Sequence, residues 1–201
     1  MTDATVIALS ALVVFVSLLV IIARFSRPGG EHEPEYRAAG RRGERSAARV
    51  ISSVLRPDEV MLRNLRISYG ERNAELDITV VNKYGVFVIE VKNYSGVLYG
   101  GKDDRKWTKK HVSRGGGVFV KPVTNPLWQV KHEVDTLARY LRYHGFDVWV
   151  EGYAFIWGAE SPVRSERIIE DEKDAARALH TPGRRLLTPA DIKGIRELLE
   201  Q

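Results

Sequence analysis

Residues Ala74–Tyr94 read AELDITVVNKYGVFVIEVKNY, and this stretch decides the fold that the chain is expected to adopt. Two runs within it, Asp77–Val81 and Val86–Val91, are rich enough in β-branched and apolar residues to be strands. Asn82–Gly85 between them supplies turn residues, with a glycine available for a positive φ angle. The stretch therefore predicts an antiparallel hairpin.

The register of this hairpin determines where its charged side chains meet. If the loop holds two or four residues, Asp77 lies directly opposite Glu90. Lys92 then falls opposite Glu75, whereas a three-residue loop with a bulge at Gly85 would shift the register. Directly opposed side chains have Cβ atoms about 4.5–5.5 Å apart, so two carboxylates repel each other unless a positive charge lies between them. A divalent cation would meet that requirement.

Glu90 and Lys92 also have a simpler interpretation. They share one face of a strand and could form a solvent-facing ion pair that contributes almost nothing to stability. A site is favoured because Val86–Ile89 is apolar on both faces, as in a central strand, and the charges arrive only at its end. Asp77 also arrives in register with Glu90.

A helix is expected before the hairpin, over Tyr36–Leu55, and Pro57 ends it. Its apolar stripe includes Ala47 and Ile51, and Glu44 lies on the same line. A glutamate there is either a helix-start acid stabilised by the N-terminal dipole or a residue of a site. The residues alone leave both interpretations open.

The segment after the hairpin is strongly basic. Short strands are expected at Val97–Tyr99 and at Lys106–His111, with Trp107 and Phe119 interleaved among the basic residues. Such a set suits phosphate contact combined with base stacking. The candidates for phosphate contact are Lys106, Lys109, Lys110 and Arg114. A solvated basic hairpin on a membrane-facing surface explains the same residues equally well.

A second helix begins at Asn125, which acts as the N-cap before a proline, and ends at His144-Gly145. Its expected core stripe is Leu127, Val130, Val134, Leu137 and Leu141. The opposite side holds Gln129, His132, Glu133 and Thr136. A further strand is expected at Val148–Trp157, followed by two short helices at Glu172–His180 and Pro189–Glu200. This order predicts an α/β domain with a small mixed sheet flanked by helices.

The chain begins with an apolar run, Thr5–Ala23, that contains no charged residue. A helix of about 20 such residues crosses a hydrocarbon core of about 30 Å. Arginines follow this run and none precedes it, so the positive-inside rule predicts a cytoplasmic domain. The expected organisation is a transmembrane anchor at 1–25, a linker at 26–36, a globular domain at 37–160 and a helical extension at 161–201.

Composition limits the chemistry and the partners. The chain has no cysteine, and its five histidines show no metal-ligand spacing, so disulfides and a zinc site are not expected. The glycine run at 115–117 lacks the pattern of a nucleotide-binding loop. A net charge of +5 favours an anionic partner, and both membrane lipid and nucleic acid are anionic.

Asp77, followed after twelve residues by Glu90-Val91-Lys92, resembles the D…(D/E)XK signature of the PD-(D/E)XK nuclease superfamily. The sequence around this signature, GVFVIEVKNYSG and later NPLWQ, is similar to the nuclease-related domain called NERD, and the similarity covers roughly Gly43–Trp157. Leu76 stands where the superfamily's nominal proline precedes the aspartate.

This resemblance implies a restriction-endonuclease-like fold and metal-assisted hydrolysis of phosphodiester bonds. Asp77, Glu90 and the backbone carbonyl of Val91 would hold Mg²⁺ or Mn²⁺ through oxygen atoms. Lys92 would orient or help deprotonate the attacking water and offset charge on the phosphate. Glu44 would complete the site from the first helix.

The resemblance also gives Gln129 a role, because Gln129 occupies the place of the glutamine in the family's NPxxQ motif. That role would lie near the active centre or the substrate, whereas the alternative is an ordinary surface amide. The implied partner is nucleic acid, with DNA favoured. Two other functions stay open: a membrane-tethered binding module that does not cut, and a scaffold at the lipid surface.

Overall fold

A computed structural model describes residues 35–201 except 114, 162, 164 and 182–185. In this part of the chain the helices are α2 (Glu35–Val54), α3 (Pro126–Tyr143), α4 (Glu172–His180) and α5 (Pro189–Leu199). The strands are β1 (Val60–Tyr69), β2 (Arg72–Asn82), β3 (Gly85–Tyr99), β4 (Lys106–Val112), β5 (Val118–Thr124), β6 (Val150–Glu160) and β7 (Ile168–Ile169).

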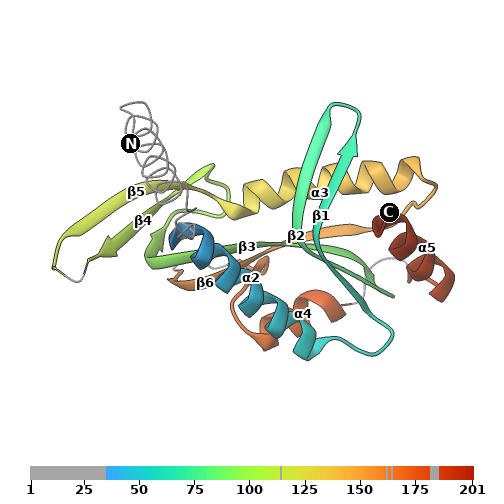
Figure 1. Cartoon of the computed structure of the whole chain (residues 1–201), viewed down its shortest axis with the longest axis horizontal. Helices are drawn as coiled ribbons and strands as arrows, with labels where there is room; N and C mark the ends of the chain where they lie inside the picture. Colours follow the sequence, from blue (N-terminus) through green and yellow to red (C-terminus); the bar gives the residue numbers. More distant parts are fainter. Residues whose placement is uncertain (1–34, 114, 162, 164, 182–185) are drawn as a thin grey trace, which may run out of the picture. The chain divides into compact units, whose positions relative to one another are not determined.

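The strands form one mixed seven-stranded sheet with β3 at its centre (Figure 1). Strands β1 to β5 pair antiparallel in chain order, whereas β6 pairs parallel with β3 and with β7. Apolar residues of α2 and α4 pack on one face of the sheet, and those of α3 and α5 pack on the other. The α/β class and the mixed sheet flanked by helices are therefore confirmed.

The hairpin that the sequence predicts is β2–β3, and its loop holds two residues. The register runs from Asn82 opposite Gly85 through to Ile78 opposite Ile89. Gly85 has a φ angle of 147°, and the Asn82 side chain accepts a hydrogen bond of 2.8 Å from the Tyr84 N–H. The alternative of a three-residue loop with a bulge is excluded.

One edge of β3 has a gap between its two strand partners. Pairing with β2 ends at Ile89, and pairing with β4 begins only at Val97. Strand β2 runs on beside β1, and the two strands are irregular where Asn64, with a φ angle of 53°, stands opposite Asp77. Among the described strands, none is paired with residues 90–96 of β3 on that edge.

This gap overturns one expected pairing. Glu75 does not lie opposite Lys92, because β2 has left β3 before that point. Glu75 is instead the partner of Arg66 on β1, and Arg66 Nη2 lies 3.3 Å from Glu75 Oε1. Lys92 is the partner of Ile156 on β6. The expected register is therefore confirmed from the turn to Ile78 and Ile89, whereas the pairs expected beyond it, Asp77 with Glu90 and Glu75 with Lys92, are not backbone pairs of the two strands.

Two glycines let the helices approach the centre of the sheet. A Cβ atom at Gly152 on β6 would lie 2.7 Å from the Val134 side chain, so α3 lies directly on β6. A Cβ atom at Gly43 would lie 2.8 Å from the Asn93 Cβ, so α2 lies directly on β3. The Asn93 side-chain amide also donates a hydrogen bond of 2.6 Å to the Ala39 carbonyl. Both helices are thus held beside the gap.

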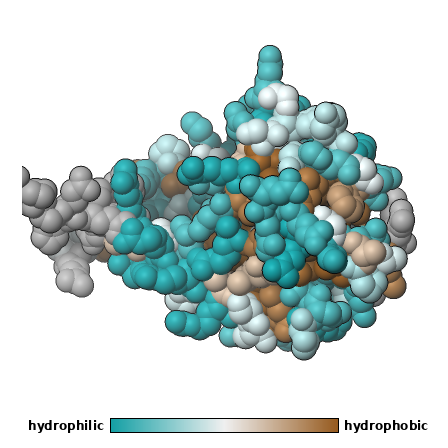
Figure 2. All heavy atoms as spheres, turned by 45° about the vertical axis from the view of Figure 1, so that its right-hand side comes forward, coloured by the Kyte–Doolittle hydropathy of each residue, from teal (hydrophilic) through white to brown (hydrophobic). Residues whose placement is uncertain are grey.

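The C-terminal helices belong to the same hydrophobic core. Ala175 and Leu179 of α4 pack with Ile51 of α2, and Ile195 and Leu199 of α5 pack on the other face of the sheet. Hydrophilic residues cover most of the face shown in Figure 2, with apolar residues visible between them. Burial of these helices completes both faces of the sheet.

Strand β5 is not among the expected strands. Pro122 argues against a central strand because proline cannot donate a ladder hydrogen bond, and the structure accommodates it on the sheet edge. No helix in the described part of the chain is both long and apolar enough to cross a bilayer. The apolar run Thr5–Ala23 and residues 26–34 of the expected linker lie outside the described residues, whereas the last two residues of that linker, 35 and 36, belong to α2.

Candidate active site

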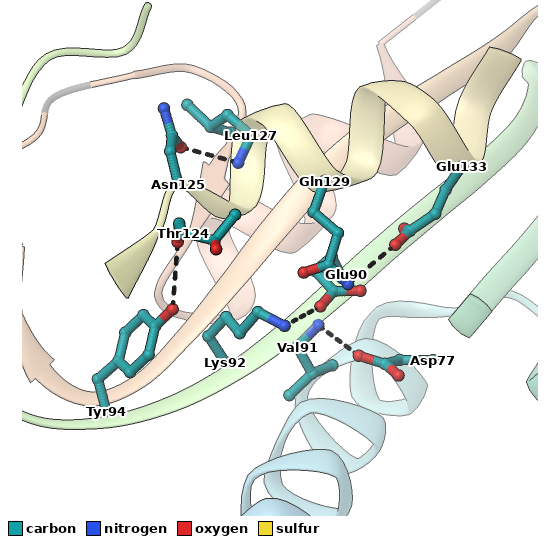
Figure 3. A network of polar contacts seen from close by, with 10 residues as sticks. All are labelled: Asp77, Glu90, Val91, Lys92, Tyr94, Thr124, Asn125, Leu127, Gln129 and Glu133. Carbon is teal, nitrogen blue, oxygen red and sulfur yellow. Dashed lines mark hydrogen bonds and ion pairs between the residues drawn. The ribbon is translucent and has the colours of Figure 1, made fainter. Parts of the chain in front are cut away.

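The gap beside β3 is filled by a side chain of β2. Asp77 is the first residue of β2 beyond its last backbone pair with β3, and its Oδ2 atom accepts a hydrogen bond of 2.8 Å from the Val91 N–H (Figure 3). The carboxylate thus takes the place of a strand acceptor. The N–H and C=O of one residue in such a strand point to the same edge, so the Val91 carbonyl is directed toward the same gap.

Glu90 and Lys92 lie at this gap and form an ion pair. Lys92 Nζ contacts Glu90 Oε1, and the Glu90 side chain is 2% exposed while that of Lys92 is 24% exposed. The interpretation as a solvent-facing ion pair is therefore wrong. A buried ion pair is costly to break on one side, because the remaining charge is left without compensation.

The electrostatics of the site reflect crowding of negative charge. Burial raises the pKa of Asp77, although its hydrogen bond from Val91 opposes the rise. Burial and then the Asp77 charge raise the pKa of Glu90. Burial alone would lower the pKa of Lys92, but the charge and hydrogen bond of Glu90 raise it overall. Lys92 is the positive charge that partly offsets the two acids.

Glu133 is a site residue that the sequence analysis missed. It was expected on the side of its helix opposite the core, but its side chain is 3% exposed and points toward Glu90 (Figure 3). Its Oε2 atom is buried and has no hydrogen-bond partner among the described residues. Burial and then the charge of Glu90 raise the pKa of Glu133 to about 9. Glu133 is consequently protonated at neutral pH.

Gln129 lies one turn before Glu133 on α3 and is half-buried. Its Nε2 donates a hydrogen bond of 3.1 Å to Glu133 Oε1. The N-cap contact of Asn125, which accepts a bond of 2.9 Å from the Leu127 N–H, fixes where this helix begins. Gln129 is therefore linked to the acidic side chains through Glu133, and it is not an isolated surface amide.

Glu44 stands apart from this cluster. It lies half-buried on α2, next to the close contact of Gly43 with Asn93. Within the described part of the chain, its side chain forms no hydrogen bond or ion pair. The structure thus holds Glu44 on the helix beside β3 without joining it to Asp77 or Glu90.

The donor atoms at the gap match the chemistry of a small divalent cation. Carboxylate and carbonyl oxygens are the ligands of Mg²⁺, which needs only one or two carboxylates and keeps several waters. Among the described residues, no three aspartate, glutamate, histidine or cysteine side chains are arranged to hold a metal. A site here would therefore rest on Asp77, Glu90 and the Val91 carbonyl. The unpaired Glu133 Oε2 provides a further oxygen beside it.

The basic candidates separate onto two faces of the β4–β5 hairpin. Lys109 is the partner of Lys121 across the hairpin, and its Nζ lies 3.2 Å from Ser95 Oγ and 5.9 Å from the Tyr94 ring. Lys106 and Lys110 alternate with it and so project from the opposite face. Arg114 lies outside the described residues.

Lys109 and Lys121 lie on the same side of the sheet as Glu90. Leu98, the β3 partner of Lys109, packs with Leu127 at the start of α3 and with Ile156, the β6 partner of Lys92. Partial burial and then the charge of Lys121 lower the pKa of Lys109. Lys109 and Lys121 are neighbours on β4 and β5, so together they would attract an anion to the part of the sheet next to β3.

Comparison with known proteins gives one family and one relative. Residues 39–157 match the family described as nuclease-related domain, NERD. An uncharacterized protein of Bacillus anthracis is 28% identical over 116 residues, which are 56% of this chain and 50% of that protein. The chain thus spans about half the length of this curated relative. No solved structure matches.

Proposed function

This chain belongs to the nuclease-related domain family, and from that premise we propose that its domain hydrolyses phosphodiester bonds of nucleic acid with Mg²⁺ or Mn²⁺. The observation that carries the proposal is the group formed by buried Glu90 and half-buried Asp77 and Lys92 at the gap in the sheet. Burying such a group is unfavourable unless its charges have partners. A role in binding a cation and a phosphate explains why the charges are there.

Each side chain has a task that follows from its position. Asp77, Glu90 and the Val91 carbonyl would hold the cation, which supplies electrophilic stabilisation of the phosphate and lowers the pKa of bound water. Lys92 would release Glu90 Oε1 to that cation and turn its ammonium toward the attacking water and the phosphate oxygens. Glu44 would support the site from α2.

Glu133 and Gln129 would hold Glu90 in position from α3. A neutral Glu133 avoids placing a third negative charge beside Asp77 and Glu90. Its hydrogen bond from Gln129 keeps the side chain directed at the site. Both residues are positioning residues in this proposal, because neither is required to touch the phosphate.

Nucleic acid would reach the site along the side of the sheet that carries Tyr94, Lys109 and Lys121. Lysines near a phosphate backbone supply affinity that does not depend on sequence, and an aromatic ring can stack on a base. DNA is the first substrate to test. The direct test is incubation of the purified protein with single-stranded, double-stranded, nicked and branched DNA and with RNA, with Mg²⁺, with Mn²⁺ or with EDTA.

Removing the two lysines on this side should weaken nucleic-acid binding in a salt-dependent way. We expect the double change Lys109→Gln and Lys121→Gln to reduce the slope of log affinity against log salt by about 1.5, from two lost phosphate contacts. The matched control removes the same charge from the other face, through Lys106→Gln and Lys110→Gln. Binding isotherms over a salt series measure both, and equal slopes for the two variants would contradict this assignment of the substrate side.

A module that binds nucleic acid without cutting it is the second candidate. The contact of Lys92 with Glu90 favours this candidate, because the ammonium already neutralises one of the carboxylates. Binding without cleavage under every metal condition would establish the module.

We further propose that the run Thr5–Ala23 anchors the protein in a membrane with the domain on the cytoplasmic side. Its support is the uncharged sequence of the run and the arginines that follow it. Protease added to inverted membrane vesicles should digest the domain, and protease added to right-side-out vesicles should leave the domain intact. The reverse pattern would place the domain outside.

A further inference from the structure

The β4–β5 hairpin extends beyond the helices of the described part of the chain (Figure 1). Alternation along the two strands places Val112, Val118 and Val120 on one face of the hairpin. These three valines are 56%, 57% and 62% exposed. The face, here called the valine face, includes Lys106, Thr108, Lys110, Val112, Val118, Val120 and Pro122, and all of these residues are exposed.

The valine face combines apolar side chains with positive charge only. Lys106 and Lys110 stand beside the valines, and no aspartate or glutamate occurs anywhere from Arg105 to His132. Exposed apolar side chains in contiguous groups mark surfaces that bind something. The charge of this group calls for an anionic partner.

The composition of the face distinguishes between anionic partners. Trp107 and Phe119 project from the other face, whereas Tyr99 of β3, the partner of Thr108, lies on this side and is 47% exposed. A tyrosine ring, apolar with a polar tip, is typical of the boundary between a bilayer and water. Aliphatic side chains surrounded by lysines suit the boundary of an anionic bilayer, where the valines enter the headgroup region and the ammonium groups contact lipid phosphates.

The length of the chain keeps a bilayer within reach of the domain. Eleven residues separate Ala23 from Glu35. Even a fully extended segment of this length covers only about 40 Å. If Thr5–Ala23 spans the bilayer, the start of α2 is therefore no farther than that from the surface.

We propose that the valine face docks on the anionic surface of the membrane. The two faces of one hairpin then have two partners: lipid on the valine face, and nucleic acid on the side of Lys109 and Lys121. The inference goes beyond the proposed function, because docking does not require cleavage. It gives a role in lipid binding to Lys106 and Lys110, which do not lie on the substrate side.

A single cysteine can test this docking, because the chain has none of its own. Val120→Cys and Phe119→Cys form a matched pair, since these neighbours are 62% and 61% exposed but project from opposite faces. The full chain, labelled with an environment-sensitive fluorophore, is reconstituted into vesicles of phosphatidylcholine with or without phosphatidylglycerol. A third label at Lys193 on α5, at the other end of the sheet, reports the solvent background.

We expect the Val120→Cys label to shift to shorter wavelength and to be quenched by lipid-borne quenchers only in the vesicles that contain phosphatidylglycerol. The Phe119→Cys and Lys193→Cys labels should change little. Lys106→Gln with Lys110→Gln should lower the ratio of docked to undocked protein about 25-fold, from about fivefold for each lysine. Lys109→Gln with Lys121→Gln should leave the ratio nearly unchanged.

Three results would overturn the proposal. The first is an equal signal from Val120→Cys in neutral and anionic vesicles, and the second is an equal response of the labels at 119 and 120. The third is a response of Val120→Cys to oligonucleotide without lipid, which would make the valine face a nucleic-acid surface. Val118→Cys, on the same face, repeats the measurement if the first variant folds poorly.

Discussion

Asp77→Asn is expected to remove metal-dependent cleavage by about a thousandfold or more, because metal polarisation of a phosphate is worth several kcal/mol. The substitution keeps an oxygen that can accept the Val91 N–H, so the fold should persist. In EDTA the variant should be as stable as the wild type or slightly more stable, since one of two crowded acids has become neutral. Cleavage rates and thermal melts in EDTA measure the two effects separately.

Lys92→Ala separates catalysis from metal binding. It leaves Asp77 and Glu90 in place, so stabilisation by added metal should remain, while cleavage should fall together with the loss of the ammonium. Without metal the variant should be less stable, because Glu90 loses its partner in a buried position. Cleavage by Lys92→Ala at the wild-type rate would exclude Lys92 from the reaction.

Glu133→Gln should change how stability depends on pH. Burial and the Glu90 charge raise the pKa of Glu133 in the folded state to about 9, whereas an unperturbed glutamate titrates at about 4.3. Folding therefore takes up a proton between these values. The wild type should lose stability as pH rises through this window, by up to about 1.4 kcal/mol per pH unit from this group. Glutamine cannot titrate and removes that slope.

The two proteins should consequently differ most near the top of the window. In EDTA, Glu133→Gln should match the wild type near pH 4.5 and exceed it in stability by one to a few kcal/mol, roughly, at pH 8. Glu197→Gln, the same substitution at an exposed position on α5, is the matched control. Denaturant unfolding across pH measures all three, and parallel curves for wild type and Glu133→Gln would mean that Glu133 is not held neutral.

The sequence predicts the part of the site that depends on local pairing. Apolar strands around Asn82–Gly85 define the turn, and the turn fixes the register as far as Ile78 and Ile89. The side on which Glu90 and Lys92 project follows from strand alternation alone. The beginning of α3 is equally local, because the Asn125 cap and the following proline require only neighbouring atoms.

The parts that could not be predicted depend on how elements meet. The departure of β2 from β3 coincides with the positive φ angle of Asn64 on β1. No glycine or proline stands next to Asn64 in the sequence to indicate a bend there. Glu133 was placed on the solvent side of its helix because the apolar stripe alone was counted. The close approach of α3 at Gly152 turns a wider arc of the helix inward, and this includes Thr136 as well.

The hairpin beyond β3 shows the same limit. Its lysines follow one another in the sequence as a single basic cluster, but alternation along β4 sends Lys109 to a different face from Lys106 and Lys110. Strand β5 had to be found before Lys121 could be placed beside Lys109. Pro122 hides that strand in the sequence, because only an edge position tolerates it.

The most direct test of the central claim is a set of thermal melts of wild type, Asp77→Asn and Lys92→Ala across a Mn²⁺ titration. A ligand that binds only the folded state raises stability with its concentration, so the site predicts a rising melting temperature for wild type and for Lys92→Ala. Asp77→Asn should respond much less. Equal shifts in wild type and Asp77→Asn would contradict the account, because they would mean that Asp77 and Glu90 do not form a metal site.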